Sequence, residues 1–174
     1  MKAEFVTHAF APVYDANSRI LILGTMPSPQ SVKHGFYYSH PQNRFWPLMS
    51  ELLNEPLPKT PAEKRALVLR HGIALWDVLA SCEIKGASDA SIRNAVPNDF
   101  ESLLKETQIS KIYTTGKMAF SLFQRLIAPS IGRDAIYLPS TSPANQALFP
   151  WKTLIETWRK LLDYSNPKSN LHDF

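Results

Sequence analysis

Short apolar runs alternate with segments of helical periodicity along most of this chain. Three such runs cover residues 19–23, 111–115 and 135–138, and each is followed directly by Gly or Pro. Apolar runs of this length that end at turn residues are typical of buried strands in a parallel sheet. A fourth run, residues 73–79, fits either a short strand or a buried segment without strand structure.

Helical signals lie between these runs. The predicted helices cover residues 47–53, 61–71, 99–104, 117–127 and 150–162. Thr60 with Glu63, and Asn98 with Glu101, have the spacing of capping boxes, so they should open the second and third of these helices. We expect an irregular lead-in before residue 19 and a long polar connection over residues 81–97.

Strands that alternate with helices require right-handed crossovers. The chain is therefore predicted to be an α/β protein, a three-layer α/β/α sandwich around a small central, mostly parallel sheet. We expect a single domain over residues 1–164 and a polar, disordered tail over residues 165–174. The loops after residues 23, 115 and 138 should all leave the carboxyl edge of the sheet, where open α/β sheets bind ligands.

The composition narrows the class of protein only slightly. The chain has 174 residues, of which 44% are hydrophobic and 20% charged, and its net charge of +4 permits a nucleic-acid partner without requiring one. Its single cysteine, Cys82, excludes an internal disulfide and any site built from several thiolates, which fits a reducing cytoplasm. No stretch reaches the ~20 apolar residues of a membrane span, so neither secretion nor membrane contact is expected.

Common catalytic motifs are missing or incomplete. Gly116-Lys117 follows a predicted strand, but Lys111 and Met118 stand where a phosphate loop needs Gly and Ser or Thr. A strand-to-helix glycine turn, whose N–H groups can still meet one DNA phosphate, explains the pair better. The five histidines lack the i, i+4 spacing of a helical metal site, and no G-x-S-x-G elbow is present. We therefore expect neither a metal nor a cofactor.

The loop before the predicted helix at Pro47 concentrates aromatic and polar side chains. Residues 36–38 are three consecutive aromatics, which serve either as core lids or as a stacking platform for a planar ring. Asn43 either caps the helix or faces a pocket, and Pro47 favours the pocket because a cap at Asn43 would put Pro47 at the fourth helical position. His34 and His40 flank the loop, either as ligand-binding or as ordinary loop residues.

Three stretches, taken in order, resemble the uracil-DNA glycosylase superfamily. They are GTMPS at residues 24–28, GFYYSHPQNRFW at residues 35–46 and LPSTSPAN at residues 138–145. They are most similar to the hypoxanthine-DNA (deoxyinosine) glycosylase branch, and the second stretch is also similar to the mismatch-specific uracil glycosylases. The resemblance implies a monofunctional enzyme of base excision repair that flips a deaminated base out of damaged DNA and hydrolyses its N-glycosidic bond. We expect such an enzyme to act as a monomer.

The resemblance also implies roles for single residues. Asn43 matches the catalytic Asn of the hypoxanthine branch, and Phe36 matches the aromatic that stacks on the base. The expected substrate-binding residues are Gly24, Thr25, Met26, Pro27, Ser28, Phe36, Tyr38 and Ser140. The expected DNA-binding residues are Ser142, Pro143, Ala144, Asn145 and Lys117.

Three positions depart from the superfamily pattern. Met26 stands where most members carry Asp or Asn to handle water, Ser140 where many carry His or Asn, and Ala144 where many carry a Leu wedge. Asn43 does not titrate, so it would position water or polarise the leaving base. Because Ala144 is small, we expect Asn145 to enter the base stack or bind the orphaned partner base. Two alternatives remain: a preference for uracil, and a DNA-damage-binding module without catalysis.

Overall fold

A four-stranded parallel sheet forms the centre of the protein. The computed structural model describes residues 1–162, so the predicted tail at residues 165–174 lies outside the described part. The strand order is β3-β2-β6-β7, and every neighbouring pair is parallel. These strands are β2 (Ile20–Gly24), β3 (Ile73–Asp77), β6 (Lys111–Thr115) and β7 (Ile136–Leu138). The predicted fold class is confirmed, and the run at residues 73–79 begins as a strand.

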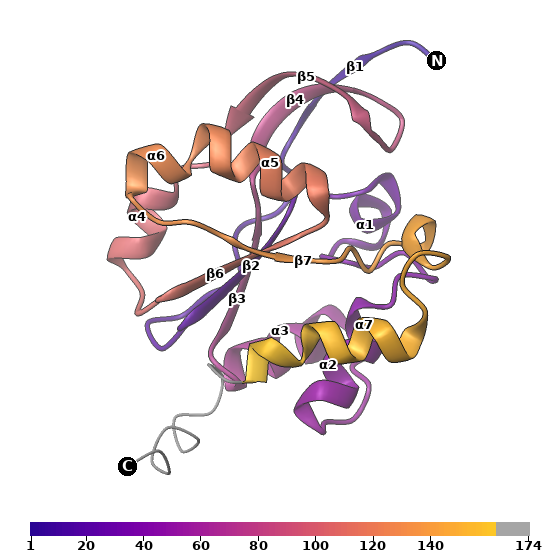
Figure 1. Ribbon diagram of the computed structural model, residues 1–174, viewed down its shortest axis with the longest axis vertical. Coiled ribbons are helices and arrows are strands. Elements are labelled where there is room, and N and C mark those ends of the chain that lie inside the picture. Colours follow the sequence, from indigo (N-terminus) through magenta and orange to yellow (C-terminus); the bar gives the residue numbers. More distant parts are fainter. Residues whose placement is uncertain (163–174) are drawn as a thin grey trace.

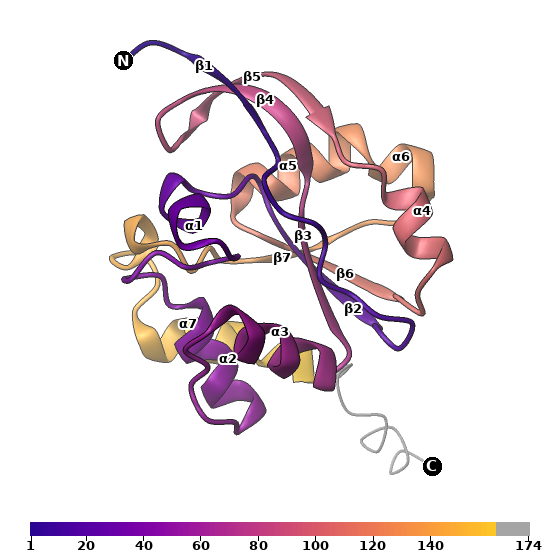
Figure 2. The same cartoon turned by 180° about the vertical axis from the view of Figure 1, so that it is seen from behind.

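Helices cover both faces of this sheet (Figures 1 and 2). On one face lie α2 (Phe45–Leu53), α3 (Pro61–Arg70) and α7 (Trp151–Trp158), which continues into η2 (Arg159–Leu161). On the other face lie α4 (Phe100–Lys105), α5 (Lys117–Leu126) and α6 (Ala128–Ile131). Two hydrophobic clusters result, one on each side of the sheet.

The first four residues of strand β2 are all apolar and do not alternate with polar residues, because both faces of the strand are buried. Ile20 and Ile22 pack into the cluster that contains α2, α3 and α7, whereas Leu21 and Leu23 pack into the cluster that contains α4 and α5. All four side chains are fully buried. A strand covered on both faces needs apolar residues at every position.

Three helices differ in how well their first residues agree with the predicted starts. The Thr60–Glu63 capping box is present and opens α3 as predicted. The cap of α4 is Asp99 instead of Asn98, which corrects the second prediction, because the Asn98 amide donates to the carbonyls of β3 and β4 instead. Helix α2 begins two residues before Pro47, with Arg44 at its N-cap position.

A second, antiparallel sheet was not predicted. It consists of β1 (Glu4–Thr7), β4 (Leu79–Lys85) and β5 (Ser88–Pro97) in the order β1-β4-β5. The expected irregular lead-in and polar connection were therefore wrong. Only one face of this sheet is covered, where Cys82, Ile84 and Ile92 join the α4–α5 cluster. Because one face of this sheet is exposed, its strands contain few apolar residues, and their sequence pattern therefore predicted a loop.

Two short helices shape the loops at the carboxyl edge of the central sheet. Helix α1 (Pro29–His34) was not predicted; its N-cap Ser28 accepts a hydrogen bond from the Ser31 N–H at 3.1 Å. The 3-10 helix η1 (Pro143–Asn145) follows β7. Among the described helices, none combines the length and apolar character needed to cross a membrane.

Candidate active site

A cavity of about 780 Å³ opens at the carboxyl edge of the central sheet. Its walls come from the loop after β2, from α1, from the loop before α2, from the β7–α7 loop and from the tip of the β4–β5 hairpin. This volume lies within the roughly 300–1,000 Å³ that small-molecule sites occupy. The loops after β2 and β7, which leave the same edge of the sheet, therefore share one pocket.

Most of the predicted site residues line this cavity. They are Gly24, Thr25, Met26, Pro27, Ser28, Tyr38, Asn43, Ser140, Ser142, Pro143 and Ala144. The structure thus brings the three sequence motifs together around one space.

Three of the predicted site residues are not among the described residues that line the cavity. Phe36 packs against the rings of Tyr37 and Trp46, with centroid distances of 5.7 and 6.0 Å. Asn145 donates its side-chain amide to the Ser140 carbonyl at 3.0 Å. Lys117 is exposed at the first position of α5. Sequence spacing alone did not separate these residues from the lining residues, because the direction of a loop side chain depends on the turns around it.

The side chain of Asn43 is held in one orientation. Its Oδ1 accepts hydrogen bonds from the Phe45 N–H at 2.9 Å and from the Thr141 hydroxyl at 2.8 Å. Since a backbone N–H can only donate, the atom that faces Phe45 must be the amide oxygen. The NH₂ group is then the part of Asn43 left to meet a ligand in the cavity. Asn43 therefore supports the start of α2 and presents a hydrogen-bond donor at the same time.

Tyr38 is an aromatic ring of the loop that does reach the cavity. It stacks on Phe45 with a centroid distance of 3.9 Å and an interplanar angle of 13°. Burial, and next the charge of Asp77, raise the pKa of the Tyr38 hydroxyl well above its ordinary value, so the phenol stays neutral. Its backbone has a positive φ of 53°, which is uncommon for a residue with a side chain and often accompanies functional sites.

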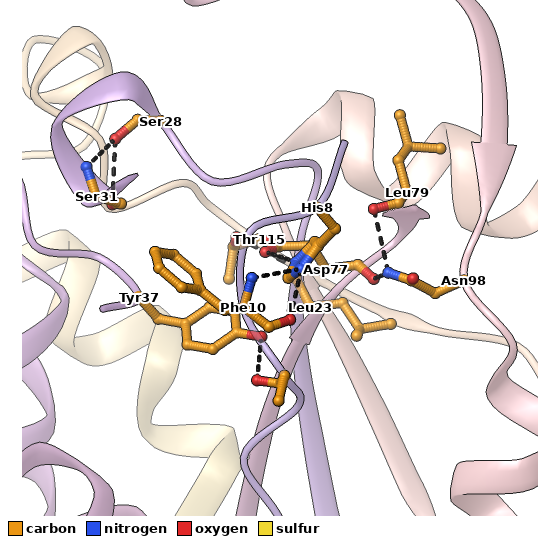
Figure 3. Close-up of polar contacts among 11 residues, drawn as sticks. His8, Phe10, Leu23, Ser28, Ser31, Tyr37, Asp77, Leu79, Asn98 and Thr115 are labelled. Atoms are coloured by element: carbon orange, nitrogen blue, oxygen red, sulfur yellow. Dashed lines mark hydrogen bonds and ion pairs between the residues drawn. The ribbon is translucent and has the colours of Figure 1, made fainter. Parts of the chain in front are cut away.

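A buried His–Asp pair lies close to the cavity, and sequence reasoning missed it (Figure 3). His8 Nε2 is 2.7 Å from Asp77 Oδ2, and the two side chains are only 6% and 5% exposed. Burial raises the pKa of Asp77, and the hydrogen bond from His8 opposes this shift. The one signal in the sequence was the carboxylate of Asp77 inside the otherwise apolar run at residues 73–79.

The His8–Asp77 pair is in contact with the cavity wall through Gly24. Gly24 is the neighbour of Asp77 in the β2–β3 ladder, and a Cβ atom at Gly24 would lie 2.6 Å from Asp77 Oδ1. Only glycine therefore fits at the end of β2 while the carboxylate keeps its place. The pair also ties the N-terminal segment to the central sheet.

Within residues 1–162, no group of three or more His, Cys, Asp or Glu side chains is arranged to hold a metal ion.

The chain is similar to known proteins over most of its length. The family model for the uracil DNA glycosylase superfamily matches residues 11–162. A hypoxanthine DNA glycosylase of Methanosarcina acetivorans is 32% identical over 142 residues, covering 81% of this chain and 89% of that protein. A hypoxanthine DNA glycosylase of Methanosarcina barkeri is 34% identical over 140 residues, covering 79% and 87%.

A solved structure agrees with these relatives. It is the solution NMR structure of a Methanosarcina acetivorans protein assigned to the uracil DNA glycosylases. It matches with a TM-score of 0.79 at 28% identity and covers 93% of this chain and 99% of its own.

Proposed function

This chain belongs to the uracil DNA glycosylase superfamily, as its three motifs indicated, and we propose that it removes hypoxanthine from DNA. The proposed reaction is monofunctional: water replaces the base at C1′ of the deoxyribose and leaves an intact strand with an abasic site. The observation that carries the proposal is the oriented amide of Asn43 in the cavity that the three motifs line. The relatives named as hypoxanthine DNA glycosylases support this choice of base.

The orientation of Asn43 favours one of its two possible roles. When the C1′–N9 bond breaks, its electron pair moves onto the purine, so negative charge develops on the base. The Asn43 NH₂ would donate a hydrogen bond to the departing base and stabilise that charge. The amide oxygen is already engaged by Phe45 and Thr141, so it is poorly available to orient a water molecule. Met26 has no group that activates water, so water would attack a carbon already made electrophilic by the leaving base.

The remaining lining residues are proposed to hold the flipped nucleotide. Extrusion of a base costs a few kcal/mol, which the pocket must return through stacking and contacts to the base edge. Tyr37 and Tyr38 of the motif loop both line the cavity, whereas Phe36 packs on Trp46. We assign Tyr38 to the base, because Tyr37 is buried and its hydroxyl donates to the Ala11 carbonyl at 3.0 Å. The backbone of residues 25–28 is proposed to read the base edge. Ser142, Pro143 and Ala144 form the side of the cavity that we assign to the DNA backbone.

We further propose that the protein acts as a monomer on duplex DNA in the cytoplasm, without a cofactor. The net charge of +4 supports a polyanionic substrate. The single cysteine is buried and free, which is compatible with a reducing compartment.

Uracil is the second candidate base, because the solved neighbour is assigned to the uracil DNA glycosylases. The test is incubation with duplex oligonucleotides that carry one deoxyinosine or one deoxyuridine, followed by alkaline cleavage of abasic sites. Cleavage at deoxyinosine is expected. Cleavage only at deoxyuridine would show that uracil, and not hypoxanthine, is the substrate. Tight binding without any cleavage would show that the protein is a damage-binding module without catalysis.

A further inference from the structure

The turn that ends at Asn43 begins at His40, and both residues line the cavity. We propose that the Nε2–H of His40 donates a second hydrogen bond to hypoxanthine as the base leaves, beside the bond from the Asn43 amide. This proposal rests on the proposed glycosylase function and adds a second catalytic residue to it.

The hydrogen bonds of the His40 ring decide which of its two nitrogens carries the proton. The ring Nδ1 lies 3.0 Å from the backbone nitrogen of Gln42. Because a backbone N–H can only donate, Nδ1 is the acceptor and the ring proton is on Nε2. Within residues 1–162, the ring forms no other hydrogen bond. The protein therefore leaves the Nε2–H donor available to a ligand.

The same turn fixes the position of His40 relative to Asn43. The Asn43 N–H donates to the His40 carbonyl at 2.9 Å, which closes a four-residue turn. Pro41 occupies the second position of the turn, where its fixed φ suits a β-turn and restricts the loop. A donor held on a restricted turn needs little reorganisation when charge develops beside it.

Hydrogen bonds to two other parts of the cavity wall hold the ends of this turn. On one side, the Ser39 N–H donates to the Ser31 hydroxyl of α1 at 3.3 Å. On the other side, the Arg44 N–H donates to the Thr141 carbonyl at 3.1 Å, and the Thr141 hydroxyl donates to Asn43 Oδ1. Ser31 and Thr141 themselves line the cavity. The turn is therefore attached to two walls of the space that the base would occupy.

A second donor suits the chemistry of a purine leaving group. When the C1′–N9 bond breaks, the negative charge spreads over the ring nitrogens and O6 of hypoxanthine, so a single side chain covers only part of it. The contact from His40 is a hydrogen bond without proton transfer. The electron pair of the broken bond stays on the base, and the His40 proton stays on Nε2. Donors aimed at developing charge of this kind lower the barrier of the chemical step.

Two substitutions separate the Nε2 donor from the structural contact of the ring. His40→Asn has an amide oxygen that can still accept from the Gln42 N–H, as in an Asx turn, but no group at the position of Nε2. His40→Gln has an amide nitrogen with about the reach of Nε2 and loses the contact with Gln42. The control is His34→Asn, since His34 is the other histidine flanking the loop, exposed at the end of α1 and outside the cavity lining.

The experiment measures single-turnover release of hypoxanthine from a deoxyinosine duplex at saturating protein, together with the Kd for that duplex. His40→Asn should lose roughly 100-fold in rate, the effect of removing one preorganised donor, and should keep the wild-type Kd. His40→Gln should retain most of the lost rate, because it keeps a donor. His34→Asn should match wild type in both rate and Kd.

The other outcomes overturn the proposal in distinguishable ways. An active His40→Asn with an impaired His40→Gln would show that the ring only shapes the turn. Equal losses in both variants, or no loss in either, would also contradict the donor role. Weaker binding with an unchanged rate at saturation would show that His40 contacts a phosphate instead of the base. A wild-type protein that releases no hypoxanthine would overturn the proposed function itself.

Discussion

Replacing Asn43 by Asp separates the two possible roles of this side chain. The carboxylate has the same shape as the amide, so one oxygen can still accept from the Phe45 N–H and the Thr141 hydroxyl. The group left for the cavity changes from a donor to a negatively charged acceptor. A role in stabilising the leaving base predicts loss of activity, whereas a role in orienting water predicts that activity survives.

The size of the effect can be worked from the contacts. Loss of a preorganised donor to developing charge costs roughly a factor of 100 to 1,000 in the chemical step. Asn43→Asp should lose at least that much while its unfolding free energy stays close to wild type, because both anchoring bonds remain. Asn43→Ala should lose a similar factor but also about 2 kcal/mol of stability, since it removes two hydrogen bonds worth about 1 kcal/mol each.

The assay is single-turnover release of hypoxanthine from a duplex, alongside urea unfolding of each variant. Asn54→Asp is the control, because it makes the same chemical change at the opposite, C-terminal end of α2, outside the cavity lining. An Asn43→Asp protein that folds and releases base near the wild-type rate would refute the donor role. A stable Asn43→Ala protein with full activity would show that Asn43 has a structural role and no catalytic role.

Two further predictions concern the DNA interface and the buried pair. If the protein binds DNA as proposed, its affinity for duplex should fall steeply as salt rises from low to moderate concentration, because the exposed Lys33 and Lys117 would pair with phosphates. Titration of a labelled duplex at several salt concentrations measures this, and binding that stays flat would contradict it. Because Asp77 has a raised pKa in the fold, it keeps a proton that the unfolded chain has lost, so its contribution to stability should decline as pH rises above the ordinary aspartate range. Urea unfolding across pH should show this decline in wild type relative to Asp77→Asn, and parallel curves would contradict it.

The parts of the fold that the sequence predicted are those with local signals. Strand β2 is buried on both faces, so its four consecutive apolar residues predicted it correctly. Helix α3 was marked by its capping box. Strands β1, β4 and β5 bury one face only, and their exposed polar residues prevented the sequence pattern from predicting them as strands.

For the candidate site, the sequence predicted the edge of the sheet at which the cavity opens, but not the contacts of each side chain. Parallel topology and the three motifs placed the cavity, and Asn43 lines it. The His8–Asp77 pair joins residues 69 apart through a sheet that was not predicted, so no local pattern could reveal it. Phe36 and Tyr38 are two residues apart with the same kind of side chain, and only the loop conformation decides that Tyr38 reaches the cavity.

The most direct test of the central claim follows the oxygen of water during the reaction. A deoxyinosine duplex is incubated with the protein in water enriched in ¹⁸O, and the products are weighed by mass spectrometry before any alkali is added. Hydrolysis at C1′ predicts free hypoxanthine without ¹⁸O, an unbroken strand, and one ¹⁸O at C1′ of the abasic sugar in samples quenched before the aldehyde form of the sugar exchanges its oxygen with the labelled water. No release of base from wild type, or a strand already cut at the lesion, would contradict monofunctional hydrolysis.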